Sequence, residues 1–328
     1  MNKRVNLVLA LASSVAIAAV SVSAPAAAEP VRISTAVWVG FGPLWLARDL
    51  GFFKKHNVDV ELVVQDDMKD KFAQLNAGTT HMMATSAGTS VIYMTKANQY
   101  QYVIATDDSN GGDGVVAAKG IASLGDLKGK SIALQQGTIS EFYLISLLKQ
   151  AGLKESDVKL TDLKPDDAGK AFLDKKVDAA VTWEPWLSKA KASDFGHLLI
   201  DSPATPGLLS DVLLVSTEYA EKHPNEVKAV VAGWNDAVAY LADHQQEAVE
   251  IMAKGVGGWL KDPKVFAETL EGVKFYGGDD NKAFFGTKAK PGPLLQTVKE
   301  AVSAWSSLGK VQVKVVPEEL LNYSFVNG

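Results

Sequence analysis

The chain has 328 residues, 47% of them hydrophobic, which is long for one core and comfortable for two lobes. Its 33 lysines and arginines against 38 acidic residues give a net charge of -5, which disfavours nucleic acid as a partner. The absence of cysteine excludes disulfides, thiolate metal sites, a cysteine nucleophile and a lipid-modified cysteine.

The first 28 residues have the pattern of an export signal. Lys3 and Arg4 precede an apolar stretch over residues 7–22, and three alanines at 26–28 match what a signal peptidase accepts. A membrane anchor is the alternative, but the stretch is rich in alanine and serine, and no later segment approaches the roughly 20 apolar residues of a span. We expect cleavage after Ala28 and a periplasmic mature protein.

The mature sequence opens with alternating strand and helix patterns. An apolar alternation over 31–38 predicts a strand, and Pro43 begins a helix that Gly51 ends. Residues 58–64 predict a second strand, 68–76 a helix and 81–85 a third strand. This alternation predicts a parallel, doubly wound sheet.

A second unit of the same kind begins near Val115. Strands are expected over 131–134, 158–160 and 179–182, and Gln136-Gly137-Thr138 turns into a helix over 140–150. A strand over 212–216 and helices over 224–241 and 245–254 follow. Because no tandem repeat or low-complexity linker separates the units, we expect two interleaved lobes.

Three motifs in order resemble those of a known family. They are Trp38 to Phe53 (WVGFGPLWLARDLGFF), Asp126 to Lys130 (DLKGK) and Val177 to Pro185 (VDAAVTWEP). With these motifs the chain resembles the periplasmic binding proteins of the nitrate, sulfonate and taurine importers, a branch that includes thiamine-precursor binders. The resemblance covers nearly the whole mature length.

The resemblance implies a two-lobed, type II-like periplasmic binding protein fold of the α/β class. Each lobe would be a mainly parallel sheet flanked by helices, with two crossover strands between the lobes. The first lobe would take residues 29–113 and 211–328, and the second residues 114–210. It further implies a monomer without cofactor that closes on a small molecule and delivers it to an ABC importer, meaning a membrane permease with its ATPase.

Ligands of open α/β sheets bind beyond the carboxyl ends of strands, and the family's binding residues map to the same places. Five loops follow predicted strand ends, and Asp211 precedes a further strand. The candidate ligand-binding residues are Trp38, Phe41, Trp45, Ser86, Asp107, Asp108, Asp113, Gln136, Thr138, Glu141, Trp183, Glu184 and Asp211.

Several of these candidates also have a structural interpretation. Trp38 and Trp45 can stack on a ligand or pack in the core. Turn chemistry accounts for one or two of the three aspartates within residues 106–114. Thr138 and Glu141 have the spacing of a capping box, whereas Glu184, between two tryptophans, favours a site.

The chemistry of these loops indicates the charge of the ligand. They contain tryptophan, aspartate and glutamate but no lysine or arginine, whereas a buried anion needs cationic donors. Aromatic faces and carboxylates suit a cation. We therefore expect a small cationic nitrogen compound, such as a guanidinium, amidine, amine or quaternary ammonium. A sulfonate, taurine or nitrate is the alternative, since backbone amides alone can hold an oxyanion.

Two other classes of protein share this architecture. The pyrimidine-precursor synthases of thiamine biosynthesis resemble these proteins, but they depend on a cysteine-rich segment, and this chain has no cysteine. The five histidines show neither metal-ligand spacing nor pairing with a nucleophile, so we expect no catalytic or metal site. A sensor that reports ligand to a membrane kinase stays an open alternative.

Overall fold

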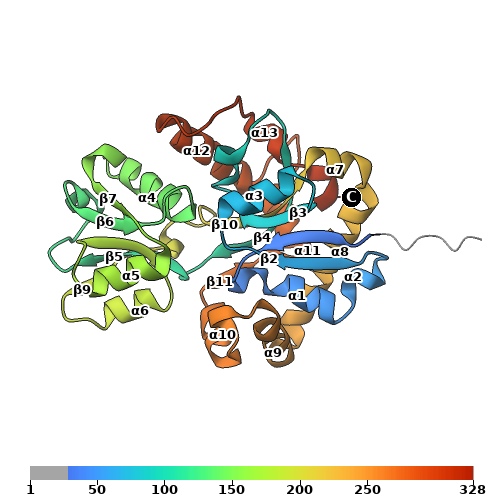
Figure 1. Ribbon diagram of the computed structural model, residues 1–328, viewed down its shortest axis with the longest axis horizontal. Helices are drawn as coiled ribbons and strands as arrows, with labels where there is room; N and C mark the ends of the chain where they lie inside the picture. Colours follow the sequence, from blue (N-terminus) through green and yellow to red (C-terminus); the bar gives the residue numbers. More distant parts are fainter. Residues whose placement is uncertain (1–28, 328) are drawn as a thin grey trace, which may run out of the picture.

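The computed structural model describes residues 29–327, which form two lobes, each built on its own sheet (Figure 1). The large lobe has six strands in the order β11-β4-β10-β3-β1-β2, and the small lobe has five in the order β7-β6-β8-β5-β9. The strands are β1 Val31–Thr35, β2 Val60–Val64, β3 Met82–Ser86, β4 Tyr100–Ser109, β5 Asp113–Ala118, β6 Ser131–Leu134, β7 Lys159–Asp162, β8 Ala179–Trp183, β9 Gly196–Asp201, β10 Ser210–Ser216 and β11 Val273–Phe275.

The first three strands form a switch point in the large sheet. β1 pairs in parallel with β2 along all five residues, but with β3 only through Ile33–Met82 and Ser34–Met83. Since the chain runs from β1 outward to β2 and then back to β3, the connections reverse at β1. The carboxyl ends of β1 and β3 therefore form the kind of switch point at which open α/β sheets bind ligands.

Helices cover both faces of the large sheet, with α3 and α12 on one side and α1 and α9 on the other (Figure 1). Asp67 begins α3 by accepting hydrogen bonds from the amides of Lys69 and Asp70, at 2.9 and 3.1 Å. The large-lobe helices are α1 Gly42–Asp49, α2 Phe52–Lys55, α3 Met68–Asn76, α7 Thr217–Lys222, α8 Pro224–Asp243, α9 Gln245–Val256, α10 Pro263–Leu270, α11 Gly278–Phe285, α12 Pro293–Ser307, α13 Pro317–Leu320 and α14 Tyr323–Val326.

The small lobe packs α4 (Ile139–Gln150), α5 (Pro165–Leu173) and α6 (Trp186–Lys191) on its sheet. β6 pairs in parallel with β7 and β8, whereas β5 pairs antiparallel with β8 and β9. In the large sheet, β10 and β11 likewise run antiparallel to their neighbours. The two-lobed α/β class is confirmed. Most strands of each sheet run in one direction, and the exceptions are β10 and β11 in the large sheet and β5 in the small sheet.

The chain crosses between the lobes from β4 to β5 and again from β9 to β10. The two crossings are tied together, since the Ser109 and Ser202 hydroxyls lie 2.9 Å apart and Ser202 Oγ accepts the Gly111 amide at 2.8 Å. The boundaries expected at 113/114 and 210/211 fall at the first residues of β5 and β10.

A second connection joins the lobes through side chains of α4, of α12 and of the segment that follows α12. Lys310 donates a hydrogen bond to the Glu141 carboxylate, and the Phe142 and Trp305 rings lie 6.5 Å apart. Trp305 Nε1 also donates to the Gly88 carbonyl at 2.6 Å. We call Glu141, Phe142, Trp305 and Lys310 the α4–α12 contact.

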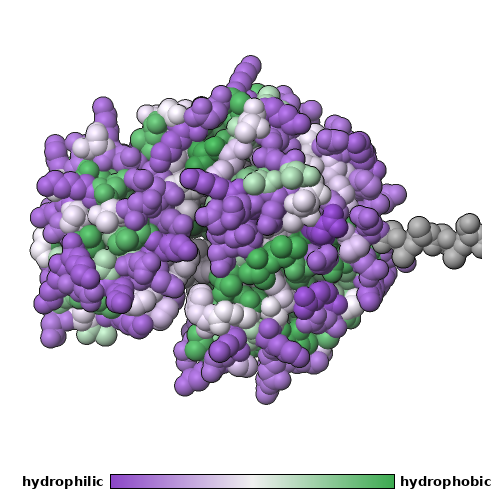
Figure 2. All heavy atoms as spheres, viewed as in Figure 1, coloured by the Kyte–Doolittle hydropathy of each residue, from purple (hydrophilic) through white to green (hydrophobic). Residues whose placement is uncertain are grey.

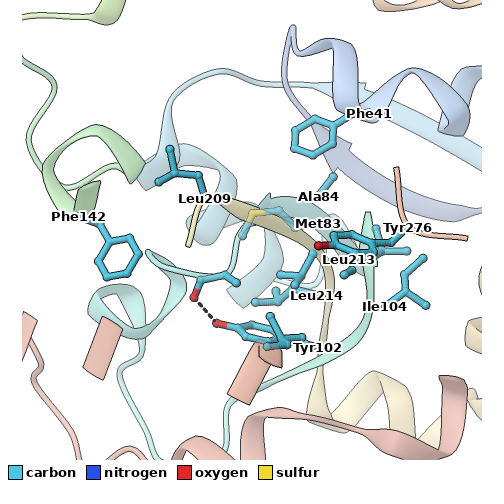
Figure 3. Packing of buried hydrophobic residues seen from close by; sticks show 14 of the residues in the cluster. Phe41, Met83, Ala84, Tyr102, Ile104, Phe142, Leu209, Leu213, Leu214 and Tyr276 are labelled. Atoms are coloured by element: carbon cyan, nitrogen blue, oxygen red, sulfur yellow. Dashed lines mark hydrogen bonds between the residues drawn. The ribbon is translucent and has the colours of Figure 1, made fainter. Parts of the chain in front are cut away.

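The main hydrophobic core runs under the large sheet and continues into the small lobe. Figure 3 shows Met83, Ala84 and Leu213 packed between neighbouring strands, with Phe41 above them and Phe142 approaching from the small lobe. Within residues 29–327, no helix is both long enough and apolar enough to span a bilayer. The export signal and its cleavage after Ala28 lie outside the described residues.

Candidate ligand site

The surface is hollowed between the lobes (Figure 2), and the switch point of the large sheet faces the small lobe there. Trp38, after β1, and Trp183, at the end of β8, approach each other across this cleft with ring centroids 6.4 Å apart. The candidate site is therefore built from strand ends of both lobes, as the sequence predicts.

Asp107 is a buried carboxylate held beside Trp38. Its Oδ1 accepts Trp38 Nε1 at 3.0 Å, and its Oδ2 accepts the Thr106 hydroxyl at 3.0 Å. Gly40 makes room for it, because a Cβ at residue 40 would lie 2.4 Å from the Asp107 carboxyl. Burial raises the Asp107 pKa to about 7, although both hydrogen bonds favour the ionised form.

Asp211 is a carboxylate to which no described residue donates a hydrogen bond. It enters the large sheet at β10 opposite Ser86 and is 9% exposed. Burial raises its pKa well above the usual range, and repulsion by Asp107 and Asp113 raises it further. A buried charge normally has a partner, so this carboxylate indicates a place for a ligand.

Two more buried acids complete the cluster. Asp108 Oδ2 accepts the Gly207 amide at 2.8 Å and so fixes the second crossing, while its Oδ1 has no partner among the described residues. Asp113 begins β5 opposite Trp183. Burial raises the pKa of each to about 6. We call Asp107, Asp108, Asp113 and Asp211 the acidic cluster.

Lys71 is a functional candidate that the loop-by-loop reading of the sequence missed. It lies on α3, is 1% exposed, and donates a hydrogen bond from Nζ to the Ala84 carbonyl at 2.7 Å. Burial lowers its pKa to about 8, although Asp211 and Asp66 pull it upward. The predicted binding loops contain no lysine or arginine, but the Lys71 ammonium, from helix α3, is close enough to Asp211 for their charges to interact.

The aromatic candidates separate into two groups. Trp183 is partly exposed at the cleft, with Nε1 donating to Asp166 at 3.1 Å, and Phe41 is 4% exposed, with its ring 5.8 Å from Lys71 Nζ. The prediction that Trp45 binds ligand is wrong. Trp45 is buried in the α1–α9 interface against Gly255, where a Cβ would lie 2.0 Å from the indole ring. It packs in the core and does not line the cleft.

The small-lobe acids have structural partners. Glu141 is fully buried and accepts the Gly137 amide at 2.5 Å as well as Lys310, while Thr138 accepts the Ser140 amide at 3.3 Å. Thr138 therefore caps α4, but the predicted capping box does not close, because Glu141 accepts the Gly137 amide and not the Thr138 amide. Glu184 accepts the Ser188 amide and hydroxyl at 3.1 and 2.9 Å, so it caps α6.

The remaining polar candidates are Ser86 and Gln136. Ser86 is buried, and its hydroxyl accepts the Gly88 amide at 3.1 Å, which shapes the loop after β3. Gln136 is exposed, with its amide bonded to Asp162 at 2.9 Å. Among residues 29–327, no three histidine, aspartate or glutamate side chains are arranged to hold a metal ion.

Comparisons with known proteins place this geometry in context. The sequence model of the family described as "NMT1/THI5 like" matches residues 38–248. A protein of Brucella abortus named as a binding protein is 26% identical over 246 residues, 73% of this chain and 74% of its own. The periplasmic aliphatic sulphonate binding protein of Escherichia coli has a similar structure, with a TM-score of 0.71, 21% identity, and coverage of 89% of this chain and 92% of its own. A desulfurization enzyme shares the fold with a TM-score of 0.61, 14% identity and 92% and 98% coverage, so the fold occurs in binding proteins and in an enzyme.

Proposed function

The chain belongs to the NMT1/THI5-like family, and on that premise we propose that it is the periplasmic solute-binding component of an ABC importer, specific for a small cationic nitrogen compound. The lobes close on the solute and present it to a membrane permease with its ATPase. The proposal includes export with cleavage after Ala28 and a monomeric mature protein.

The observation that carries the ligand class is the unpartnered Asp211 carboxylate in a cluster of four buried acids. Each of the four has a raised pKa because burial disfavours the ionised form, and repulsion by neighbouring aspartates adds to this in Asp107, Asp113 and Asp211. A cation entering the cleft relieves that repulsion and supplies hydrogen-bond donors to Asp211. An anion without a cationic group would leave Asp211 unpaired and add to the repulsion.

The tryptophans support the same class of ligand. Trp38 and Trp183 come from different lobes, and their rings are tilted by 38°. A guanidinium or quaternary ammonium between them gains cation–π attraction when the lobes close, worth about 0.5–2 kcal/mol. The two rings therefore stabilise the closed form around a cation more than they stabilise a cation bound to one lobe alone.

A thermal-shift screen of residues 29–328 tests the proposal directly. The panel contains guanidinium compounds, amines, quaternary ammoniums, sulfonates, nitrate and pyrimidines. A ligand at 100 times its dissociation constant adds about 2.7 kcal/mol to the free energy of unfolding, which is readily measured. We expect cations to stabilise the wild type and not the Asp211→Asn variant; stabilisation by nitrate and simple sulfonates alone would refute the cationic ligand.

A sulfonate, taurine or nitrate is the second candidate ligand, and the structural likeness to a sulphonate binding protein favours it. At 21% identity that likeness concerns the fold and not the ligand. The same screen separates the two candidates, since nitrate has no cationic group to bind Asp211.

Catalysis is a less favoured function for this chain. Two members of the acidic cluster, Asp107 and Asp108, are already bonded to Trp38 and Gly207. Incubation of each stabilising ligand with the protein, followed by mass spectrometry of the ligand, checks this. We expect the ligand to be recovered unchanged.

A further inference from the structure

Lys71 is a buried ammonium whose hydrogen-bonding capacity is mostly unused. Its Nζ donates to the Ala84 carbonyl at 2.7 Å, and no other described residue accepts a hydrogen bond from it. An ammonium has three N–H donors, so two are left over in a side chain that is 1% exposed. Leaving such donors unused is costly inside a protein, which points to an acceptor that enters the site.

The position of Lys71 follows from the splayed strands. Because β1 pairs with β3 only as far as Ser34–Met83, the next carbonyl of β3, that of Ala84, is available to Lys71. The ammonium therefore stands at the switch point between the carboxyl ends of β1 and β3. The Phe41 ring lies 5.8 Å from Nζ.

The Lys71 ammonium and the Asp211 carboxylate attract each other but are not in direct contact. Attraction by Asp211 raises the pKa of Lys71 against the effect of burial, yet the two side chains form no ion pair. A group with an anionic and a cationic end would give each of these two buried charges a partner. The site thus offers a donor at Lys71 and an acceptor at Asp211 at the same time.

We infer that the ligand is zwitterionic: its cationic nitrogen binds Asp211, and a carboxylate or sulfonate on the same molecule binds Lys71. This inference rests on the proposed cationic ligand and narrows it. Lys71 is then the residue that selects zwitterions over simple cations, and the acidic cluster selects them over simple anions.

Matched ligand pairs test the inference in the wild type. Calorimetric titration compares glycine betaine with choline, 4-guanidinobutanoate with agmatine, and β-alanine with propylamine. Each pair differs mainly in the presence of an acid group. We expect the zwitterion of at least one pair to bind roughly tenfold to a hundredfold more tightly, as a charge-assisted hydrogen bond implies. Equal or tighter binding of the simple cation in every pair overturns the inference and leaves the proposed function intact.

Two variants assign the preference to Lys71. Lys71→Met keeps the length and apolar stem but removes the charge, and we expect it to abolish the preference for the acid-bearing partner. Lys71→Arg keeps the charge and should retain most of the preference for the acid-bearing partner. If Lys71→Met prefers the zwitterion as strongly as the wild type does, Lys71 is not the residue that selects zwitterions. If no nitrogen cation of any kind binds and nitrate does, the proposed function fails, and the inference fails with it. Because the wild-type titrations need no variant, an unfolded Lys71→Met protein does not spoil the test.

Discussion

Asp211 and Glu141 are both buried carboxylates at the junction of the lobes, yet their surroundings differ completely. Glu141 accepts the Gly137 amide at 2.5 Å and the Lys310 ammonium, whereas Asp211 accepts no hydrogen bond from a described residue. Burial alone therefore does not separate a binding acid from a structural one. The difference lies in whether the fold itself satisfies the charge, and the following variants test that distinction.

The largest expected effect is on binding at Asp211. Asp211→Asn should weaken the cationic ligand about 100-fold, because it removes the charge that the ligand neutralises. It should also raise the unfolding temperature of the empty protein, since an unpaired buried charge is lost. Calorimetric titration and thermal unfolding measure the two quantities. A variant that binds normally but unfolds more easily would make Asp211 structural, like Glu141.

The opposite pattern is expected at the α4–α12 contact. Lys310→Met leaves Glu141 buried without its cation and should lower the free energy of unfolding by about 2 kcal/mol. Lys299→Met is the matched control, because Lys299 pairs with Glu318 at 2.8 Å on the surface and should cost under about 1 kcal/mol. Urea unfolding compares them, and equal losses would show that the buried pair contributes nothing beyond an exposed one.

A pH titration sharpens the same comparison. Asp107, with a pKa of about 7, and Asp113, with a pKa of about 6, are protonated more easily in the folded than in the unfolded chain. Ionising them as the pH rises through 6 and 7 therefore costs stability, while it strengthens cation binding. Between pH 5.5 and 8 we expect roughly tenfold tighter binding and a lower unfolding temperature without ligand.

One histidine opposes part of this pH trend. Burial lowers the pKa of His81, so its protonation below pH 6.5 destabilises the folded chain. The Asp211→Asn variant retains His81, and the difference between it and the wild type isolates the cluster. That difference in unfolding temperature should be larger at pH 8 than at pH 5.5; a constant difference would mean that Asp211 does not titrate in this range.

A smaller effect is expected at the aromatic wall. Trp183→Leu should weaken a cationic ligand about fivefold, the loss of one cation–π contact of roughly 1 kcal/mol. Trp186→Leu is the control, because Trp186 donates to the same Asp166, at 2.9 Å, but its ring lies against Gly169 and Lys189. Equal losses of affinity in the two variants would assign the effect to the shared Asp166 contact.

The smallest effect is expected at Glu184. Its carboxylate caps α6 through Ser188, so Glu184→Gln should change affinity less than about twofold. The helix should lose up to about 1 kcal/mol of stability, which thermal unfolding can detect. A large loss of affinity would instead return Glu184 to the binding site.

The sequence predicts the local elements well, because their signals are local. Met68–Asn76 and Ser131–Leu134 have the expected bounds, since Asp67 caps the first and Gly129 precedes the second. The antiparallel strands of each sheet were not foreseen, since strand direction depends on the crossings and not on any pattern within a strand.

The site residues divide in the same way. Glu184 could be found because it follows the end of β8, whereas Asp107 and Asp108, expected in a loop, lie inside β4. Burial and hydrogen-bond partners separate Asp211 from Glu184, and neither can be read from the sequence. Lys71 was missed because it lies among charged residues on a helix. One signal was present, since Lys71 shares a helical face with Leu75, four residues on, and that face is buried. Trp45 is the opposite case: the sequence offers it as a site residue, but its side chain packs in the hydrophobic core.

Trp38 and Trp183 together form an intrinsic spectroscopic probe of lobe movement. Two indole rings 6.4 Å apart are close enough for their electronic transitions to couple, and each ring belongs to a different lobe. Any rotation of one lobe against the other changes that coupling, so near-ultraviolet circular dichroism follows the movement without an added label. The same pair that we propose encloses the ligand thus makes the opening and closing of the protein visible in solution.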